Sequence, residues 1–150
     1  MSTIAAILRH KDHALGGHAV ASVGPDVSIA DVARELTEKR IGAVLVRDAG
    51  PQILGILSER DIVRSLAQHG AAALGMKAAE LMTRSLRTAT PQTTVAEAMA
   101  MMTAGRFRHI PVLEDGRLVG LVSIGDVVKS RIMEQESEVD SLKAYVAGFA

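Results

Sequence analysis

The most constraining feature of this sequence is an internal duplication. Residues 23–65 align with residues 89–130 at an offset of 66, which falls to 65 because Pro51-Gln52 is matched by the single residue Arg117. The identical pairs are Pro25/Pro91, Ala30/Ala96, Thr37/Thr103, Arg40/Arg106, Val46/Val112, Gly50/Gly116, Gly55/Gly120, Ser58/Ser123, Asp61/Asp126, Val63/Val128 and Ser65/Ser130. Chance similarity does not keep such a register, so the chain contains two copies of one structural unit.

Each copy has the pattern of a short strand, a helix, a hairpin and a second helix. The first helix opens with a capping-box pattern, Ser28-x-x-Asp31 or Thr94-x-x-Glu97, followed by apolar residues at helical spacing. Two apolar runs around a glycine-containing turn then indicate a β-hairpin. The expected strands are 19–23, 43–46 and 53–57 in the first copy and 86–89, 110–113 and 118–122 in the second. A second helix begins at Ser58 or Ser123, so the order βαββα is expected twice.

The size of one copy requires the two copies to cooperate. A unit of about 40 residues is near the lower limit for folding alone without metals or disulfides. Its strands are apolar at nearly every position, which is typical of a sheet covered on both faces. We therefore expect an α+β fold in which tandem βαββα units pack about a pseudo-twofold axis. Such an axis generates two equivalent clefts, where ligands commonly bind.

The chain divides into five segments within one compact domain. These are an N-terminal helix or linker at 1–17, the first copy at 18–68, a connection at 69–83, the second copy at 84–131 and a helical tail at 132–150. The connection is expected to be short and partly helical. The tail carries an apolar stripe of Ile132, Val139, Leu142 and Val146 among charged residues. That stripe packs either on its own domain or against a second subunit.

Composition excludes several functional classes. The 17 basic and 17 acidic residues balance, so no net field draws the chain to nucleic acid or to an anionic membrane. One tyrosine, two phenylalanines and no tryptophan leave little for stacking on single-stranded nucleic acid. No apolar run approaches the roughly 18 residues of a membrane span. We expect a cytoplasmic protein that binds neither membranes nor nucleic acid.

The sequence also offers little for catalysis or for a metal. Cysteine is absent, which removes disulfides, thiolate nucleophiles and cysteine metal sites. No Walker motif, dinucleotide glycine fingerprint or Ser-His-acid arrangement is present, so no enzyme is expected. The one cluster resembling metal ligands is His10, Asp12, His13 and His18. It lacks a spaced second pair of ligands, and a surface or linker role is favoured over zinc.

The order of motifs within each copy resembles a known family. A proline, apolar residues at helical spacing, a strand and a glycine turn lead to Gly55-x-x-Ser58-x-x-Asp61 or to Gly120-x-x-Ser123-x-x-Asp126. This order resembles the CBS motif, and its two copies resemble a tandem CBS pair, or Bateman module, over about residues 18–131. The whole chain is similar to small bacterial stand-alone CBS-domain proteins.

The resemblance implies a regulatory, energy-sensing module rather than an enzyme. Members of the family bind adenosine-containing ligands in the cleft between the two motifs: AMP, ADP or ATP, and in some members NAD(H) or S-adenosylmethionine. No further cofactor is required. The implied partners are the nucleotide, a second copy in a homodimer and an unidentified regulated protein. The alternative is a ligand-free module for dimerisation or protein interaction.

The two Ser-x-x-Asp turns are the sharpest candidate sites. A serine at a helix start, Ser58 or Ser123, leaves backbone N–H groups that favour phosphate oxygens. An aspartate one turn later, Asp61 or Asp126, can accept hydrogen bonds from both ribose hydroxyls. The same spacing is also a capping box, and residues 28–31 show one where no ligand is expected. The family resemblance favours the ligand role.

Basic residues near these turns are candidates for phosphate contact. Arg60 lies inside the first motif, but its counterpart is Gly125, so the two sites differ chemically. Arg108 and His109 enter a strand of the second copy, where cations can neutralise a di- or triphosphate. Alternation along a strand sends Arg108 and His109 to opposite faces. The competing interpretations are a solvated helix surface for Arg60 and a charged strand edge for the pair.

The remaining candidates are weaker. Ser22 and Thr88 occupy matching positions before the repeat prolines, where family members place a hydroxyl toward ligand phosphate. A hydroxyl at a strand end also commonly bonds its own backbone. Ile41, Ala43 and Ile110 could form aliphatic walls for the adenine, although ordinary core residues have the same pattern.

Overall fold

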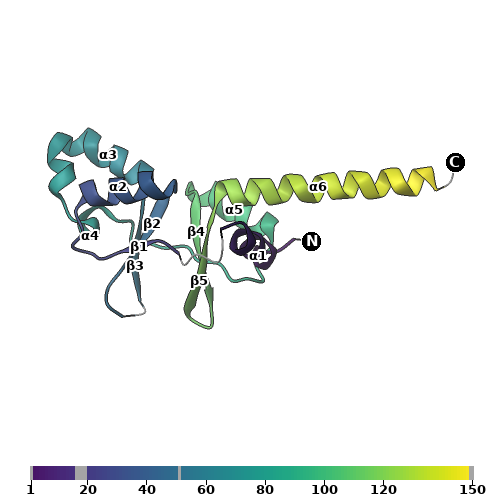
Figure 1. The fold of residues 1–150 in the computed structure, drawn as a ribbon, viewed down its shortest axis with the longest axis horizontal. Coiled ribbons are helices and arrows are strands. Elements are labelled where there is room, and N and C mark those ends of the chain that lie inside the picture. Colours follow the sequence, from purple (N-terminus) through teal and green to yellow (C-terminus); the bar gives the residue numbers. More distant parts are fainter. Residues whose placement is uncertain (1, 16–19, 51, 149–150) are drawn as a thin grey trace. The chain divides into compact units, whose positions relative to one another are not determined.

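The structure is a computed structural model that describes residues 2–15, 20–50 and 52–148, with side chains at all of these except 12–15. The chain forms two compact units, each with its own apolar core. One unit consists of residues 19–86 and holds the first copy of the repeat. The other combines residues 1–18 with residues 87–150 and holds the second copy (Figure 1).

The first-copy unit has the predicted βαββα order. Its elements are β1 (Ser22–Val23), α2 (Ile29–Lys39), β2 (Ala43–Arg47), β3 (Ile53–Ser58) and α3 (Glu59–His69). The central strand β2 pairs parallel to β1 and antiparallel to β3. Four successive residues of β2, 43–46, are buried, as expected for a strand covered on both faces. The hairpin register sets Ala43 opposite Ser58, so β2 begins where α3 begins.

The second-copy unit repeats this order with one difference. Its elements are α5 (Val95–Gly105), β4 (His109–Glu114), β5 (Arg117–Ser123) and α6 (Ile124–Ala147). The predicted strand at 86–89 is reduced to one parallel bridge between Ala89 and Val112. In the first unit the Leu45 amide donates to the Ala21 carbonyl at 3.0 Å. Pro111 replaces that leucine and has no N–H to donate, so the strand cannot extend.

The predicted connection at 69–83 is part of the first unit's body. It forms a 3₁₀ helix, η1 (Gly70–Gly75), and a short helix, α4 (Ala78–Leu81). Ala73 and Ala78 are fully buried, and Ala78 and Met82 belong to the core that α2 and β2 share. The partly helical character expected from the sequence is therefore present, but the segment is packed rather than a simple spacer.

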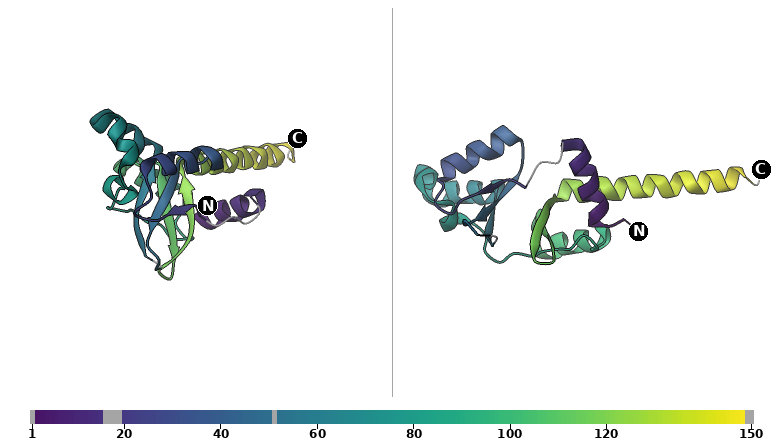
Figure 2. Two further views of the ribbon diagram at one scale, coloured as in Figure 1. Left: turned by 60° about the vertical axis from the view of Figure 1, so that its left-hand side comes forward. Right: turned by 60° about the horizontal axis from the view of Figure 1, so that its bottom comes forward.

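The N-terminal helix α1 (Ile4–Leu15) packs into the core of the second unit, as α4 packs into that of the first (Figure 2). Ile4 is fully buried, and its amide donates to the Thr93 carbonyl at 2.9 Å. The Ala78 amide of α4 donates to the Val27 carbonyl at 2.8 Å. Val27 and Thr93 are matched repeat positions, so α1 and α4 are structural equivalents that cap opposite copies.

The repeated glycine of each hairpin, Gly55 or Gly120, allows a capping segment to lie close to the sheet. The capping segments are α1 in the second unit and residues 76–83, which include α4, in the first. A Cβ at Gly55 would lie 2.7 Å from the Met82 sulfur, and a Cβ at Gly120 would lie 2.5 Å from Leu8 Cδ2. Both distances are shorter than real Cβ contacts, because the backbone of β3 or β5 sits directly under the capping segment. At Gly55 a Cβ would also lie 2.8 Å from the Thr83 carbonyl oxygen, so a larger residue there would displace the backbone after α4. At Gly120 the close atoms all belong to the Leu8 side chain, which would have to move.

The last helix, α6, continues well beyond its packed first turns. Val127 is fully buried, whereas every residue from 135 to 147 is exposed. The tail predicted as helical is thus one helix of 24 residues with the second motif's helix. Among the described residues, no helix is both long enough and apolar enough to cross a membrane.

Candidate functional site

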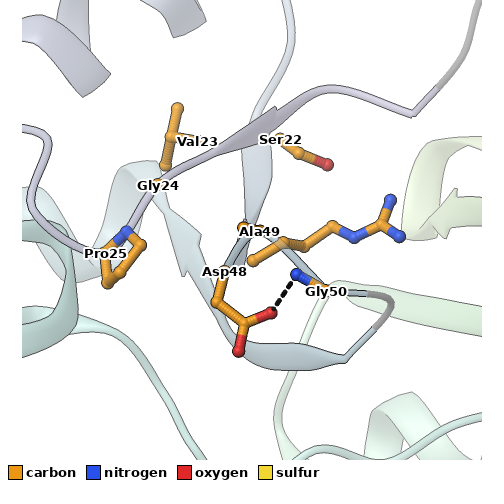
Figure 3. A pocket seen from close by; sticks show the side chains of 8 residues that line it. Ser22, Val23, Gly24, Pro25, Asp48, Ala49 and Gly50 are labelled. Carbon is orange, nitrogen blue, oxygen red and sulfur yellow. Dashed lines mark hydrogen bonds between the residues drawn. The ribbon is translucent and has the colours of Figure 1, made fainter.

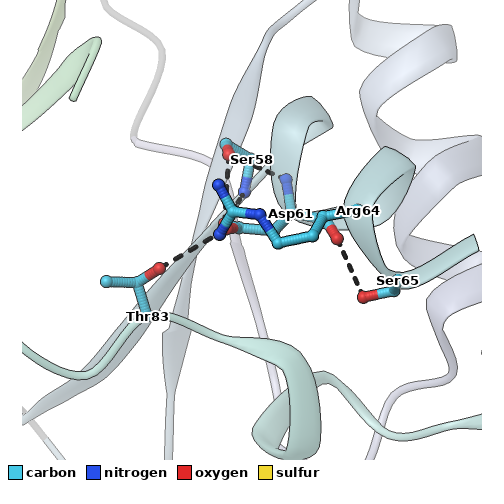
Figure 4. Close-up of polar contacts among 5 residues, drawn as sticks. All are labelled: Ser58, Asp61, Arg64, Ser65 and Thr83. Carbon is cyan, nitrogen blue, oxygen red and sulfur yellow. Dashed lines mark hydrogen bonds and ion pairs between the residues drawn. The ribbon is translucent and has the colours of Figure 1, made fainter. Parts of the chain in front are cut away.

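The first Ser-x-x-Asp turn is a closed capping box (Figure 4). Ser58 ends β3 in extended conformation, and its hydroxyl accepts a hydrogen bond from the Asp61 amide at 3.3 Å. The Asp61 carboxylate accepts from the Ser58 amide at 2.9 Å and from the Ser58 hydroxyl at 3.0 Å. Local helix-start chemistry therefore fixes the position of this aspartate before any ligand arrives.

The second oxygen of Asp61 faces groups from two other positions. The Thr83 hydroxyl donates to Asp61 Oδ1 at 3.5 Å, and an Arg64 nitrogen lies 3.9 Å from the same oxygen. The Asp61 side chain is only 11% exposed, whereas that of Arg64 is 61% exposed. The carboxylate is thus a nearly buried acceptor with a long, exposed cation at its solvent side.

The second Ser-x-x-Asp turn has the same cap and a different neighbour. The Asp126 carboxylate accepts from the Ser123 amide at 2.8 Å, and the Ser123 hydroxyl accepts from the Asp126 amide at 3.1 Å. Here α1 adds Lys11, whose ammonium lies 2.9 Å from Asp126 Oδ2. The same ammonium donates to the Leu121 carbonyl at 2.7 Å. Lys11 therefore joins α1, β5 and the start of α6 in one polar cluster.

These contacts shift the acidity of Asp126. Partial burial raises the pKa of its carboxyl. The hydrogen bond from the Ser123 amide and the contact with Lys11 lower it by more, so the pKa lies below the ordinary value of 3.8. Asp126 is consequently a firmly ionised acceptor at neutral pH.

Two predicted phosphate contacts lie beside this turn. His109, the first residue of β4, is the cross-strand partner of Ser123. The Arg108 carbonyl accepts from the Ile124 amide at 2.8 Å, which ties the residue before β4 to the start of α6. Arg108 is exposed and His109 is partly buried, as the predicted alternation requires. The structure thus gathers Ser123, Asp126, Arg108 and His109 in one unit.

The other basic residues near the turns have different surroundings. Arg60 is exposed on the first turn of α3, one residue before Asp61, and Gly125 takes its place in α6. Arg106 ends α5 with left-handed backbone at φ 56°, as Arg40 ends α2 at φ 53°. These two repeated arginines therefore mark helix ends in both copies.

Ser22 lies at a groove in the first-copy unit (Figure 3). The groove has a volume of about 470 Å³ and is lined by Ser22, Val23, Gly24, Pro25, Arg47, Asp48, Ala49 and Gly50. The Ser22 hydroxyl is 3.4 Å from the Val20 carbonyl, and the Asp48 carboxylate accepts from the Gly50 amide at 2.8 Å. The groove lies at the end of β2 opposite to Ser58. The repeat counterpart of Ser22, Thr88, is exposed next to the single bridge of Ala89.

The residues predicted as adenine walls lie mainly in the interior. Ile110 has no exposed surface and belongs to the second unit's core, and Ala43 is 2% exposed. Ile41 is partly buried and packs against the first unit's core. Their packing role is evident, and their contact with a base stays a prediction.

Most of the histidine cluster lies outside the residues whose side chains the structure describes. His10 is exposed on α1, whereas His18 and the side chains of Asp12 and His13 lie outside the described residues. No group of three or more potential ligands comes together among the residues that the structure describes.

Sequence reasoning missed Lys11 and Thr83, the partners that α1 and the segment after α4 supply to the two aspartates. The two copies align over residues 23–65 and 89–130, and α1 and residues 76–83 lie outside both ranges. Residues 2–8 and 76–82 match at an offset of 74, with Ala5 over Ala79 and Leu8 over Met82. That weak similarity points to the two capping segments but includes neither Lys11 nor Thr83, so it gives no direct signal for their contacts with the aspartates.

Comparison with known proteins agrees with this fold. The CBS domain model matches residues 17–68 and 78–132. The chain is 35% identical to the mitochondrial CBS domain-containing protein CBSX3 of Arabidopsis thaliana, over 98% of this chain and 73% of that protein. It superposes on a CBS-domain protein of Agrobacterium tumefaciens with a TM-score of 0.81 and 45% identity, over 87% of this chain and 93% of that one.

Two more distant structures share the fold and contain adenosine compounds. CBSX2 in complex with AMP has a TM-score of 0.68 at 23% identity, over 90% of this chain and 99% of that one. A CBS domain pair with 5′-methylthioadenosine and S-adenosyl-L-methionine has a TM-score of 0.74 at 24% identity, over 91% and 98%. The duplicated βαββα units, their matching caps and these similarities lead to one conclusion: the chain belongs to the CBS-domain family, as a tandem CBS pair.

Proposed function

We propose that this protein is a regulatory sensor that binds an adenine nucleotide, AMP, ADP, ATP or NAD(H), at its two Ser-x-x-Asp turns. The observation that carries the proposal is the repeated geometry of the turns. Each presents an ionised or nearly buried carboxylate, fixed by a serine cap, at the N-terminus of a helix of 11 or 24 residues. The structures that share this fold and are in complex with AMP, or with 5′-methylthioadenosine and S-adenosyl-L-methionine, support an adenosine compound as the class of ligand.

Each part of the turn has a proposed role. Asp61 and Asp126 accept hydrogen bonds from the ribose hydroxyls, in charge-assisted bonds of roughly 1.5–3 kcal/mol each. The Glu59 amide already donates to the Gly42 carbonyl at 3.0 Å and the Ile124 amide to the Arg108 carbonyl at 2.8 Å, so the positive end of the helix dipole at α3 and α6, rather than these two amides, is proposed to favour phosphate oxygens. Arg60 serves the first turn, and Arg108 and His109 serve the second.

The two turns are proposed to differ in ligand preference. The second turn has Arg108, His109 and Lys11 beside Asp126, whereas Arg60 and Arg64 accompany Asp61. Each turn has two fixed cations, and the second adds the His109 imidazole as a further group that can hydrogen-bond phosphate, so the second turn is proposed as the site for a di- or triphosphate. A ribose at this turn shares Asp126 with Lys11, which links nucleotide binding to the position of α1.

The sensor is proposed to act in the cytoplasm as a homodimer and to control a partner protein through its ligand-dependent state rather than by catalysis. A ligand that binds two arrangements of the protein unequally shifts their populations, and that shift is the regulatory signal. Ser22 and Thr88 are proposed as further hydroxyl contacts to phosphate.

Calorimetric titration with AMP, ADP, ATP, NADH and S-adenosylmethionine tests the proposal. We expect at least one ligand to bind and to raise the melting temperature, since a ligand at 100 times its Kd adds about 2.7 kcal/mol. Asp61→Asn and Asp126→Asn each weaken binding at one turn by about tenfold or more, the equivalent of one charge-assisted bond. Asp31→Asn is the matched control, because Asp31 sits in the same Ser-x-x-Asp pattern at the start of α2.

A ligand-free interaction module is the second candidate function. It is favoured by the fact that both aspartates already have partners, namely their own serine caps together with Thr83 or Lys11. Unchanged melting curves with all five ligands would establish this alternative. Equal affinity of wild type, Asp61→Asn and Asp126→Asn would remove the ribose roles even if a nucleotide binds elsewhere.

A further inference from the structure

The outer part of α6 has no support from its own unit. Residues 135–147 are all exposed, and α6 extends past the other elements of its unit in all three views (Figures 1 and 2). A lone helical segment of this length is marginal in water, because helices shorter than about 12–15 residues rarely form without packing. Ile132 and Val139 are half exposed, and Leu142 and Val146 are more than 60% exposed. This apolar face is expected to pack against another surface in solution.

The spacing of that face is that of a coiled coil. Ile132, Gln135, Val139, Leu142 and Val146 follow one another at alternating steps of three and four residues. We call these five residues the seam. In heptad terms the β-branched residues 132, 139 and 146 occupy a positions, and Gln135 and Leu142 occupy d positions. β-branched residues at a with leucine at d favour parallel two-stranded coiled coils.

The surface around the seam already has the shape that such packing uses. A hollow of about 400 Å³ lies on α6 and is lined by Ile132, Gln135, Glu136, Val139, Asp140 and Lys143. In a coiled coil each seam side chain enters a hole formed by four residues of the facing helix. The hollow lies between successive a positions of the seam, where a side chain of a second helix would insert.

The charged residues beside the seam favour a second copy of α6 as the partner helix, in parallel orientation. In a parallel pair each g residue meets the e residue five positions later in the other helix. Arg131 then faces Glu136 of a second copy, and Glu138 faces Lys143 of a second copy, so both pairs are attractive. From 131 to 147 the helix carries four acidic residues and two basic ones, which disfavours an anionic membrane surface.

We propose that the seam of α6 is a self-association surface on which a second copy of this chain packs in a parallel, in-register coiled coil. The proposal specifies the homodimer named above and does not depend on nucleotide. It places the two α6 helices side by side with identical seam residues facing each other.

The natural absence of cysteine allows a direct test of direction. Ile132→Cys and Val146→Cys place single thiols about 21 Å apart along the helix. In a parallel pair each thiol faces its own copy, so both variants form disulfide-linked dimers under mild oxidation without nucleotide. Ser137→Cys lies on the opposite face of α6 and is the matched control, with slow, concentration-dependent cross-linking only. If either seam variant cross-links no faster than Ser137→Cys, the parallel arrangement is wrong.

Sedimentation velocity on the nucleotide-free full chain tests the surface itself. Wild type and Ser137→Lys are expected to be dimers, whereas Val139→Lys is expected to sediment as a monomer at the same concentration. Glu138→Lys weakens the dimer, and adding Lys143→Glu restores it. A monomeric wild type, or a dimer that Val139→Lys leaves intact, overturns the proposal. Nucleotide titration of Val139→Lys keeps this outcome separate from a failure of the sensor function.

Discussion

The two Ser-x-x-Asp turns of this molecule have the same backbone conformation, but different side chains contact their aspartates. In both copies the serine hydroxyl accepts a hydrogen bond from the aspartate amide, and the aspartate carboxylate accepts one from the serine amide. Corresponding distances in the two copies differ by at most 0.2 Å. Asp61 faces a threonine hydroxyl from the segment after α4, whereas Asp126 faces the ammonium of Lys11 on α1. Duplication has therefore preserved what the turn builds for itself. The two turns differ in the residues that the capping segments supply, Thr83 and Lys11, and these segments lie outside the aligned repeats.

The largest expected effect concerns the packing of α1 on the second unit. Ile4→Ala removes a fully buried side chain from that core and should lower the free energy of unfolding by about 2–5 kcal/mol. Urea unfolding followed by circular dichroism measures the loss. Arg9→Ala, on the exposed side of the same helix, is the control and should change stability little. A loss below about 1 kcal/mol for Ile4→Ala would show that α1 is not part of the second unit's core.

The next effect separates the two turns by pH. The folded-state pKa of Asp126 lies below its ordinary value, so the unfolded chain takes up this proton first as the pH falls. The stabilisation from its charge is therefore complete above about pH 4 and is lost as the pH falls through the folded-state pKa. We expect wild type to be more stable than Asp126→Asn at pH 7, with the difference closing toward acid pH in urea titrations.

Lys11→Met provides the matched background for that measurement. When the ammonium is absent, the effect of Asp126→Asn on the free energy of unfolding at pH 7 should shrink, since one of the contacts that lower the pKa is gone. A difference between Asp126→Asn and wild type that stays constant from about pH 7 to about pH 2.5 would contradict the assignment of charge to this carboxylate.

The smallest expected effect is at an exposed ion pair of the other capping segment. Lys77 lies 3.5 Å from Asp26, with side chains 57% and 84% exposed, whereas the Lys11 and Asp126 side chains are 32% and 24% exposed. Because water and salt screen an exposed pair, Lys77→Met should change the free energy of unfolding by less than about 0.5 kcal/mol. A larger change than that of Lys11→Met in the same buffer would reverse the ranking of the two capping segments.

Much of the fold could be predicted from the duplication, because the signals involved are local. Capping boxes, helical spacing and hairpin turns each act within a few residues, and the helices at Ile29, Glu59, Val95 and Ile124 begin where those signals place them. The one strand that fails, before Pro91, fails because of Pro111, which lies well beyond it in the chain. The missing N–H of Pro111 is readable from the sequence only once the parallel pairing is known.

The surroundings of the candidate site were less accessible to sequence reasoning. Ser58, Asp61, Ser123 and Asp126 were singled out because their spacing is local, and the caps that this spacing predicts are present. Lys11 was not, since it meets Asp126 across 115 positions of the chain. Only the packing of α1 against β5 creates that contact, and no spacing rule covers it.

The placement of α1 also orders the assembly of the molecule. Residues 19–86 form a unit continuous in sequence, so all the contacts within this unit become available once this stretch has been synthesised. The other unit needs segments from both sides of residues 19–86, so α1 must wait for the last strands to be synthesised before Ile4 can be buried. Closing that long loop is slow compared with local folding. A tag or truncation close to α1 would therefore be felt far along the sequence, in the environment of Asp126.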